Sequence, residues 1–111
     1  MIALALTLAA VDDLQARFYL TGNALYELCT ADERSKQLSC LSYIEGASDA
    51  LGTAVTLIGQ PLFCTAQGVS VGQEKDVVVG YLRDHPADRH KSAGVLTAIA
   101  LTIAFPCPTT N

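Results

Sequence analysis

Apolar residues in the middle of the chain recur at the spacing of one face of an α-helix. They follow one another in steps of one, three or four residues and comprise Cys40, Tyr43, Ile44, Ala47, Leu51, Ala54, Val55 and Ile58. We expect one long helix over residues 35–58, ending at Gly59. Gly46 and Gly52 lie inside this helix, where each costs about 1 kcal/mol relative to alanine. We therefore expect another helix to cross closely at these two glycines.

Polar residues before the long helix separate it from a shorter one. The short helix is expected to follow Asn23 as its cap and to cover residues 24–29. Asp32 or Ser35 is the expected cap of the long helix, because both lie in the polar stretch that precedes it.

Two more helices are predicted in the second half of the chain. Ser70 and Gln73 have the spacing of a capping box and begin a helix that ends near Asp84, ahead of Pro86. The β-branched run at residues 77–79 also suits a strand. The last helix ends at residues 105–108, and its expected buried face consists of Ala93, Leu96, Ile99, Ala100 and Ile103. These patterns together predict an all-α fold: a small four-helix bundle with one long central helix.

The N-terminus begins with an apolar run, Met1 to Val11, followed at once by Asp12 and Asp13. This run resembles the apolar region of a secretory signal but lacks a basic stretch before it, and it is too short to span a bilayer as a helix. Three interpretations remain: a short element packed on the core, a truncated or mis-started signal, or an uncleaved anchor. No other stretch has the length and composition of a membrane span.

Composition narrows the class of protein. The chain has 111 residues, 50% of them hydrophobic and 16% charged, which suits one folded domain and not a disordered segment. Its net charge is -4 and its seven Lys and Arg residues are scattered, which argues against a nucleic-acid surface. Four cysteines in so short a chain suggest two disulfides and an oxidising compartment.

The four cysteines allow three pairings. We favour Cys29 with Cys40 and Cys64 with Cys107, because each bond then anchors a segment at a helix end. On a chain-entropy treatment these bonds are worth roughly 3 and 4 kcal/mol. Free thiols or a metal site remain the alternative, although the spacing does not match a zinc finger or ribbon.

Catalytic motifs are absent from the sequence, and we expect neither an enzyme nor a cofactor. His85 and His90 are five residues apart across a turn and are interpreted as exposed residues, partner contacts or, least favoured, metal ligands. Glu45 and Asp49 lie one helical turn apart. This spacing fits a pair of catalytic carboxylates in a hydrolase, part of a metal site or a solvated acidic patch. The patch is the commonest outcome for such a pair.

Several short segments together resemble the Rap/Tai family of immunity proteins, which protect against amidase toxins of type VI secretion. They are GNALYELC (22–29), CLSYIEGASDA (40–50), LFC (62–64), GVSVGQ (68–73), YLRDHPADRH (81–90) and AFPCP (104–108). The resemblance covers residues 22–108 in order. It implies an immunity domain there, preceded by a partial signal-like segment at 1–21 and followed by a tail at 109–111.

The resemblance also implies a function. Members are small, helical, disulfide-containing periplasmic proteins, usually homodimers, that bind a peptidoglycan amidase and block its active site. A periplasmic helical scaffold with another partner is the alternative. The net negative charge of the chain suits a positively charged partner. We expect two contact surfaces: the turn with Asp84, His85, Asp88, Arg89 and His90, and the exposed face of the long helix with Glu45, Ser48 and Asp49.

Overall fold

The computed structural model describes residues 18–108 and is built from helices. The four α-helices and one short 3₁₀ helix are α2 (Gly22–Thr30), α3 (Arg34–Ile58), α4 (Val71–Asp84), η1 (Pro86–Asp88) and α5 (Ala93–Ala104). The only strand-like pairing among these residues is the isolated bridge between Thr21 and Ser92. The expected all-α bundle with one long helix is confirmed. The apolar run at 1–11 and the tail at 109–111 lie outside the described residues.

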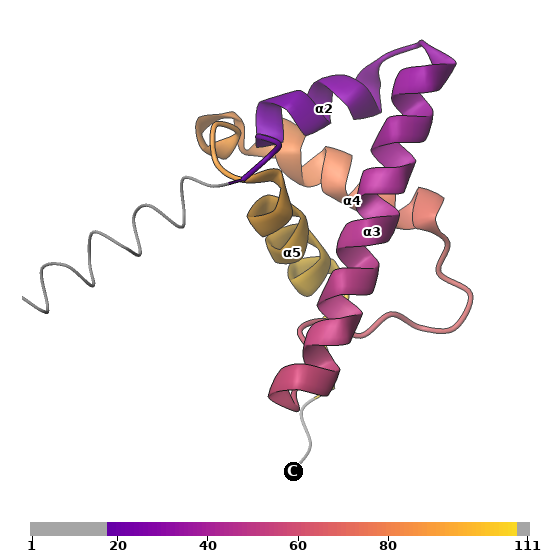
Figure 1. Cartoon of the computed structure of the whole chain (residues 1–111), viewed down its shortest axis with the longest axis vertical. Helices are drawn as coiled ribbons and strands as arrows, with labels where there is room; N and C mark the ends of the chain where they lie inside the picture. The colour runs from indigo at the N-terminus through magenta and orange to yellow at the C-terminus, as the bar shows by residue number, and fades with distance from the viewer. Residues whose placement is uncertain (1–17, 109–111) are drawn as a thin grey trace, which may run out of the picture.

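Helix α3 runs the length of the described body, and the other helices pack along part of it (Figure 1). Helix α2 lies to one side of its upper part, α5 lies beside its middle, and α4 passes behind. Leu25 of α2, Ile44 of α3, Leu82 of α4 and both Leu96 and Leu101 of α5 meet in the core, each no more than 2% exposed. One shared core therefore joins all four helices.

The caps explain where α2 and α3 begin, and they correct two expectations. Thr21, and not Asn23, caps α2, because its hydroxyl accepts a hydrogen bond from the Ala24 amide at 3.1 Å. Neither Asp32 nor Ser35 caps α3, which begins after Glu33 without a side-chain cap. These first-turn amides are exposed at a corner of the molecule, so water can satisfy them in place of a side chain.

The end of α3 and the start of α4 lie where the capping residues in the sequence predict them. Gly59 ends α3 with a left-handed backbone at φ 78°, and its amide donates to the carbonyl of Val55 at 2.8 Å. Ser70 and Gln73 form the expected capping box. The Gln73 amide donates to Ser70 Oγ at 3.2 Å, and the Ser70 amide donates to Gln73 Oε1 at 2.7 Å. Residues 77–79 lie within α4, so the strand interpretation is wrong.

The buried face of α5 differs in part from the expected one. Ala93, Leu96 and Ala100 are buried as predicted, whereas Ile99 is 38% and Ile103 is 67% exposed. Thr97 and Leu101 are buried in their place. Helix α5 contains no charged residue, so its sequence offers no polar side to define the opposite apolar face. The face that packs is decided by α2, α3 and α4, which all contact α5.

The long helix is less buried than its apolar spacing suggests. Only Cys40 and Ile44 are fully buried, most of the other predicted positions are partly exposed, and Ile58 is 62% exposed. The predicted close crossing at Gly46 and Gly52 is wrong, because a Cβ added at either glycine would meet nothing within 4 Å. The far end of α3 extends beyond the other helices, which explains the exposure there (Figure 1).

The two disulfides pair as expected, Cys29 with Cys40 and Cys64 with Cys107, so the interpretation with free thiols is wrong. Cys29 and Cys40 join α2 to α3, while Cys64 and Cys107 join the α3–α4 connection to the segment after α5. Within residues 18–108, no helix has the length and apolar character needed to cross a membrane.

Candidate functional site

The α4–α5 turn, residues 84–91, is a compact structure and the first candidate surface. Helix α4 stops at Asp84, and Pro86 then begins the short η1 helix. The amide of Asp88 donates to the His85 carbonyl at 3.1 Å, and the amide of Lys91 donates to the Asp88 carbonyl at 2.9 Å. These bonds satisfy the backbone within the turn, which therefore presents its side chains on a defined frame.

His85 is held against α4 by its neighbour one helical turn earlier. Its ring stacks on Tyr81 with centroids 4.0 Å apart and planes at 18°. Its Nδ1 lies 2.8 Å from the Tyr81 carbonyl oxygen. Because a carbonyl oxygen only accepts, the hydrogen bond requires a proton on Nδ1. The stacking and this bond present the exposed imidazole to a partner in one orientation, with Nε2 directed away from the Tyr81 carbonyl.

Asp88 and Lys91 form an ion pair across the same turn, with Nζ and Oδ1 3.0 Å apart. The hydrogen bond from Lys91, and then the charge of Lys91, lower the pKa of the Asp88 carboxyl below its ordinary value. A second ion pair lies at the end of α4, where Arg83 Nε and Asp84 Oδ1 are 3.5 Å apart and both side chains are exposed. The turn therefore offers charges of both signs, with His90 also exposed.

Arg89 turns inward and supports the turn. Its guanidinium carbon lies 4.5 Å from the centre of the Tyr26 ring on α2, which is cation–π geometry. Its carbonyl accepts a hydrogen bond from the Asn23 amide at 2.7 Å. Arg89 is half-buried, and its Nε is a buried donor with no partner among the described residues. The side chain contacts α2, which the sequence interpretation of Arg89 as an outward contact missed.

Helix α2 is joined to the turn at its N-terminus, so the two form one surface. The Gly22 amide donates to the Lys91 carbonyl at 2.9 Å, and the Ala93 amide donates to the Leu20 carbonyl at 2.9 Å. A Cβ at Gly22 would lie 2.9 Å from the Arg89 carbonyl oxygen and would collide with the Leu96 side chain. Glycine at this position therefore allows the start of α2 to lie close to the backbone of the turn and to Leu96. Nothing in the local sequence distinguishes it from any other glycine near a helix start.

The second expected surface, on α3, is smaller than predicted. Glu45 and Asp49 are exposed, but Ser48 is half-buried and donates from Oγ to Glu74 Oε1 at 3.1 Å. Ser48 therefore faces α4, and the expectation that it lies on the exposed face is wrong. Within residues 18–108, no three His, Cys, Asp or Glu side chains gather as metal ligands. The geometry of Glu45 and Asp49 is that of a solvated acidic pair.

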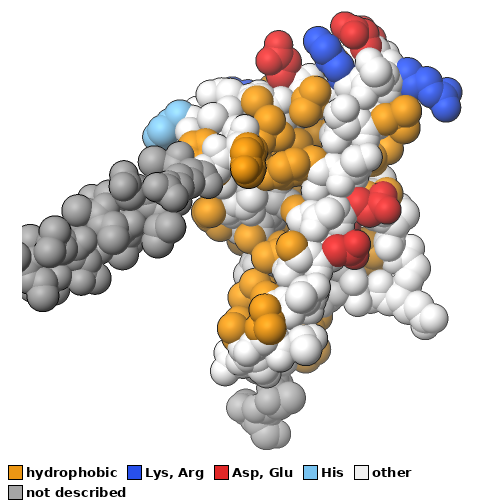
Figure 2. Space-filling model, in the orientation of Figure 1, with side chains coloured by type: hydrophobic (Ala, Val, Ile, Leu, Met, Phe, Trp, Pro, Cys, Tyr) orange, Lys and Arg blue, Asp and Glu red, His pale blue; other side chains and the backbone are white. Residues whose placement is uncertain are grey.

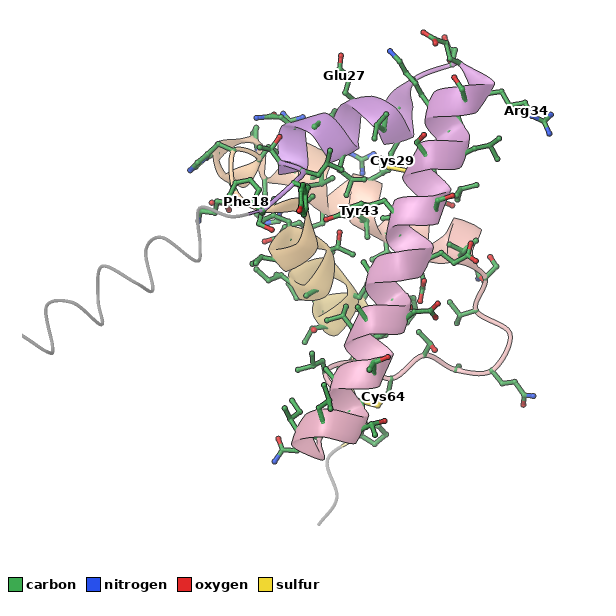
Figure 3. All side chains as sticks on the ribbon, in the orientation of Figure 1. Phe18, Glu27, Cys29, Arg34, Tyr43 and Cys64 are labelled. Carbon is green, nitrogen blue, oxygen red and sulfur yellow. A yellow bond between two sulfur atoms is a disulfide. The ribbon has the colours of Figure 1, made fainter. Side chains whose placement is uncertain are left out.

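A third surface, which the sequence did not reveal, is a groove between α3 and the start of α5. It has a volume of about 520 Å³ and is lined by Ser42, Tyr43, Gly46, Ala47, Ala50, Leu51 and Gly94. We call it the α3–α5 groove. Tyr43 points from α3 toward α5 (Figure 3), and burial raises the pKa of its phenol above the ordinary value. Small side chains form the groove because Gly46, Ala47 and Gly94 leave space that no neighbour fills.

Helix α5, which contributes Gly94 to the groove, also carries exposed apolar side chains. Val95, Ile99 and Ile103 repeat every four residues and are 55%, 38% and 67% exposed. Figure 2 shows hydrophobic side chains gathered between α2, α5 and α3, with acidic side chains on the other side of α3. This apolar stripe is a candidate interaction surface. Helix α5 has no charged residue, so no charge interrupts the stripe.

These features define a class of protein: a small helical scaffold, cross-linked by two disulfides, that presents surfaces for binding. The family model of the Rap1a immunity proteins matches residues 21–107, and the chain belongs to this family. No curated protein matches the chain.

Membership confirms the family resemblance and indicates immunity to a secreted toxin, which the protein binds as its partner. Immunity families are generally non-enzymatic. The two disulfides and the family together indicate a protein that works outside the cytoplasm.

Proposed function

We propose that the protein neutralises a peptidoglycan amidase delivered by a type VI secretion system, by binding the amidase in the periplasm and blocking its active site. The observation that carries the proposal is family membership over residues 21–107 together with the rigid turn at 84–91. A protruding turn held by internal hydrogen bonds loses little conformational entropy when it enters a concave site.

The turn supplies the principal contacts in this proposal. Asp84, His85, Asp88 and His90 reach the partner, and Arg89 contributes by fixing the turn against Tyr26. His85 offers its second ring nitrogen, Nε2, in a fixed orientation, which suits a hydrogen bond to a polar group in the partner's site. Glu45 and Asp49 form a second contact, and Ser48 serves that face through its bond to Glu74.

The α3–α5 groove is the dimer interface in the same proposal. The lining carries no charged residue, and neither does α5, so a contact between two copies here places no like charges directly against each other, although each copy carries a net charge of -4. The exposed Val95 and Ile99 of one copy fit the small-residue floor of the other, as an isologous interface requires. The toxin-binding turn stays outside this contact, and residues 22–108 form the functional domain.

Co-expression tests the function. The amidase encoded beside the gene is directed to the periplasm, and growth is measured with and without this protein. We expect rescue, and we expect it to fail for the double variant Asp84→Ala with His90→Ala. Asp32→Ala, an exposed acidic substitution away from the turn, is the matched control and should rescue fully.

The outcomes separate the alternatives. Full rescue by the double variant would reject the turn as the contact. No binding to any hydrolase encoded next to the gene would reject amidase immunity and favour a periplasmic helical scaffold with another partner.

Sedimentation tests the dimer. Val95→Glu places a charge on the exposed apolar stripe without touching the core, since Val95 is 55% exposed. We expect a monomer for this variant and a dimer for the control Thr53→Glu, which is exposed on α3 and does not line the groove. A wild-type chain that sediments as a monomer at high concentration contradicts the interface.

A further inference from the structure

The two disulfides lie at opposite ends of the described body and in different surroundings. Cys29 and Cys40, the proximal disulfide, are 3% and 0% exposed beneath α2 and α3. Cys64 and Cys107, the distal disulfide, are both partly exposed and join the α3–α4 connection to the segment after α5. Figure 3 shows Cys29 beside the upper part of α3 and Cys64 near its lower end.

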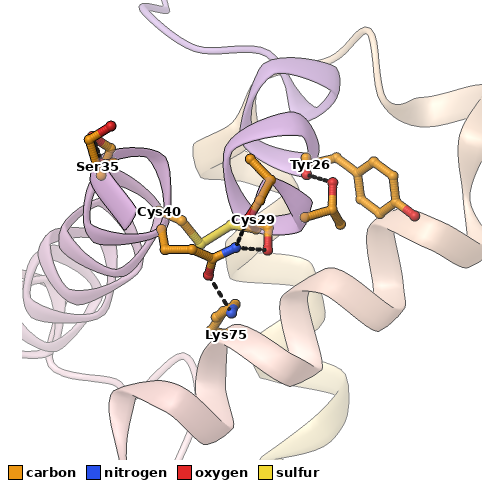
Figure 4. Close-up of a disulfide and its surroundings, with 9 residues drawn as sticks. Tyr26, Cys29, Ser35, Cys40 and Lys75 are labelled. Carbon is orange, nitrogen blue, oxygen red and sulfur yellow. Dashed lines mark hydrogen bonds between the residues drawn. A yellow bond between two sulfur atoms is a disulfide. The ribbon is translucent and has the colours of Figure 1, made fainter. Parts of the chain in front are cut away.

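The proximal disulfide is covered by a network of hydrogen bonds. The Gln37 side-chain amide donates to the carbonyls of Cys29, at 3.1 Å, and Ala31. Lys75 of α4 donates to Gln37 Oε1 at 2.8 Å, so three helices meet over this bond (Figure 4). A reductant reaches these sulfurs only if the core separates.

The distal disulfide is covered by fewer hydrogen bonds and by less buried neighbours than the proximal disulfide. The Cys64 amide donates to the Phe105 carbonyl at 2.8 Å, and the Thr102 hydroxyl donates to the Leu62 carbonyl at 3.2 Å. No residue of the connection 59–70 is fully buried. Leu57, in the last turn of α3 above it, is 80% exposed. Opening this end therefore costs the contacts of a loop and of the half-buried Phe63 and Phe105, which pack against the edge of the core, and leaves the fully buried side chains in place.

We propose that the distal disulfide is a redox-sensitive cross-link that a dithiol reductant opens while the proximal disulfide and the four-helix core stay intact. A thiolate of the reductant attacks Sγ of Cys64 or Cys107, which breaks the bond between them and forms a mixed disulfide. The second thiolate of the reductant then displaces the remaining cysteine. Two electrons pass to the protein, each cysteine gains a proton, and the reductant ends as a disulfide.

Reduction affects one end of the molecule. The connection 59–70 and the segment 105–108 lose their covalent link, and the half-buried Phe63 and Phe105 become more exposed. The turn at 84–91 lies at the other end and depends on hydrogen bonds to α2. The surface formed by α2 and the turn therefore survives in the singly reduced protein. This inference concerns the chain alone and does not depend on the identity of the toxin.

Graded reduction with dithiothreitol tests the proposal. Thiols are alkylated at each concentration and located by peptide mass spectrometry. We expect Cys64 and Cys107 to be labelled at least about tenfold faster than Cys29 and Cys40, as local opening precedes global unfolding. Labelling of all four cysteines at one rate, or of the proximal pair first, overturns the proposal.

Hydrogen exchange locates the opened segment. In the singly reduced protein, amides of residues 52–70 and 101–108 should lose protection, while those of α2 and α4 keep it. The double variant Cys64→Ser with Cys107→Ser should reproduce this pattern and keep its helical circular dichroism. A double variant that fails to fold, or loss of protection in α2, shows that the distal disulfide supports the core and overturns the proposal.

Discussion

Replacing Gly22 by alanine tests the close approach of α2 to the turn, where an added Cβ has less room than at any other glycine of the described residues. The added Cβ would lie 2.9 Å from the Arg89 carbonyl oxygen, a distance that real Cβ atoms essentially never show. That oxygen already accepts a hydrogen bond from the Asn23 amide, so the backbone cannot withdraw without losing it. A second neighbour, the Leu96 side chain, is 2% exposed within the core, so moving it disturbs the packing around it.

Two opposing terms decide the size of the effect. Overpacking at a rigid site costs about 1–3 kcal/mol. Alanine recovers at most about 1 kcal/mol of helix propensity over glycine, and less in the first turn, where Gly22 lies. We expect a net loss of about 1–2 kcal/mol. For a chain of 111 residues this lowers the melting temperature by roughly 4–8 °C.

Urea unfolding followed by circular dichroism measures the effect, with Gly52→Ala as the matched control. Gly52 is a helical glycine whose added Cβ would meet nothing within 4 Å, so alanine there should stabilise by about 1 kcal/mol. The two variants are therefore expected to move the midpoint in opposite directions. A Gly22→Ala protein as stable as the wild type would refute the tight approach between α2 and the turn.

Four further predictions follow from the contacts. Ser70→Ala removes the capping box of α4 and should cost about 1 kcal/mol in urea unfolding; no change would contradict the cap. Gln37→Ala leaves two carbonyls without donors and should cost about 1–2 kcal/mol in the same assay, against little for the exposed Gln67→Ala. Lys91→Met should raise the pKa of Asp88 in a carboxyl NMR titration; the stabilisation by this pair is present above the unfolded pKa and is lost as the pH falls through the folded pKa. Tyr43→Phe should remove an ionisation that an ultraviolet titration finds above the ordinary tyrosine pKa, because burial raises the pKa of Tyr43; stability should fall in the wild type as the pH rises through this range, since the unfolded chain loses that proton first.

The candidate site was predicted in outline but not in its contacts. The turn was placed correctly between two helices, because Pro86 and the charged stretch around it are local signals. The inward direction of Arg89 was missed, since its partner Tyr26 lies on another helix. The bond from Ser48 to Glu74 was missed for the same reason, and the α3–α5 groove depends on two segments about forty residues or more apart.

The sequence by itself determined that the protein is helical and where several of its helices begin or end. The start of α4 and the end of α3 depend on residues within about four positions of one another, Ser70 with Gln73 and Gly59 with Val55, so local chemistry is sufficient there. The sequence allowed three pairings of the four cysteines, and the tertiary structure decided among them, because Cys64 and Cys107 are 43 residues apart. Tertiary structure alone decided which side of the uncharged α5 is buried, because its pattern defines no polar face. It also decided that Gly22, and not Gly46 or Gly52, is the glycine at which two segments touch, since a close approach depends on what lies opposite.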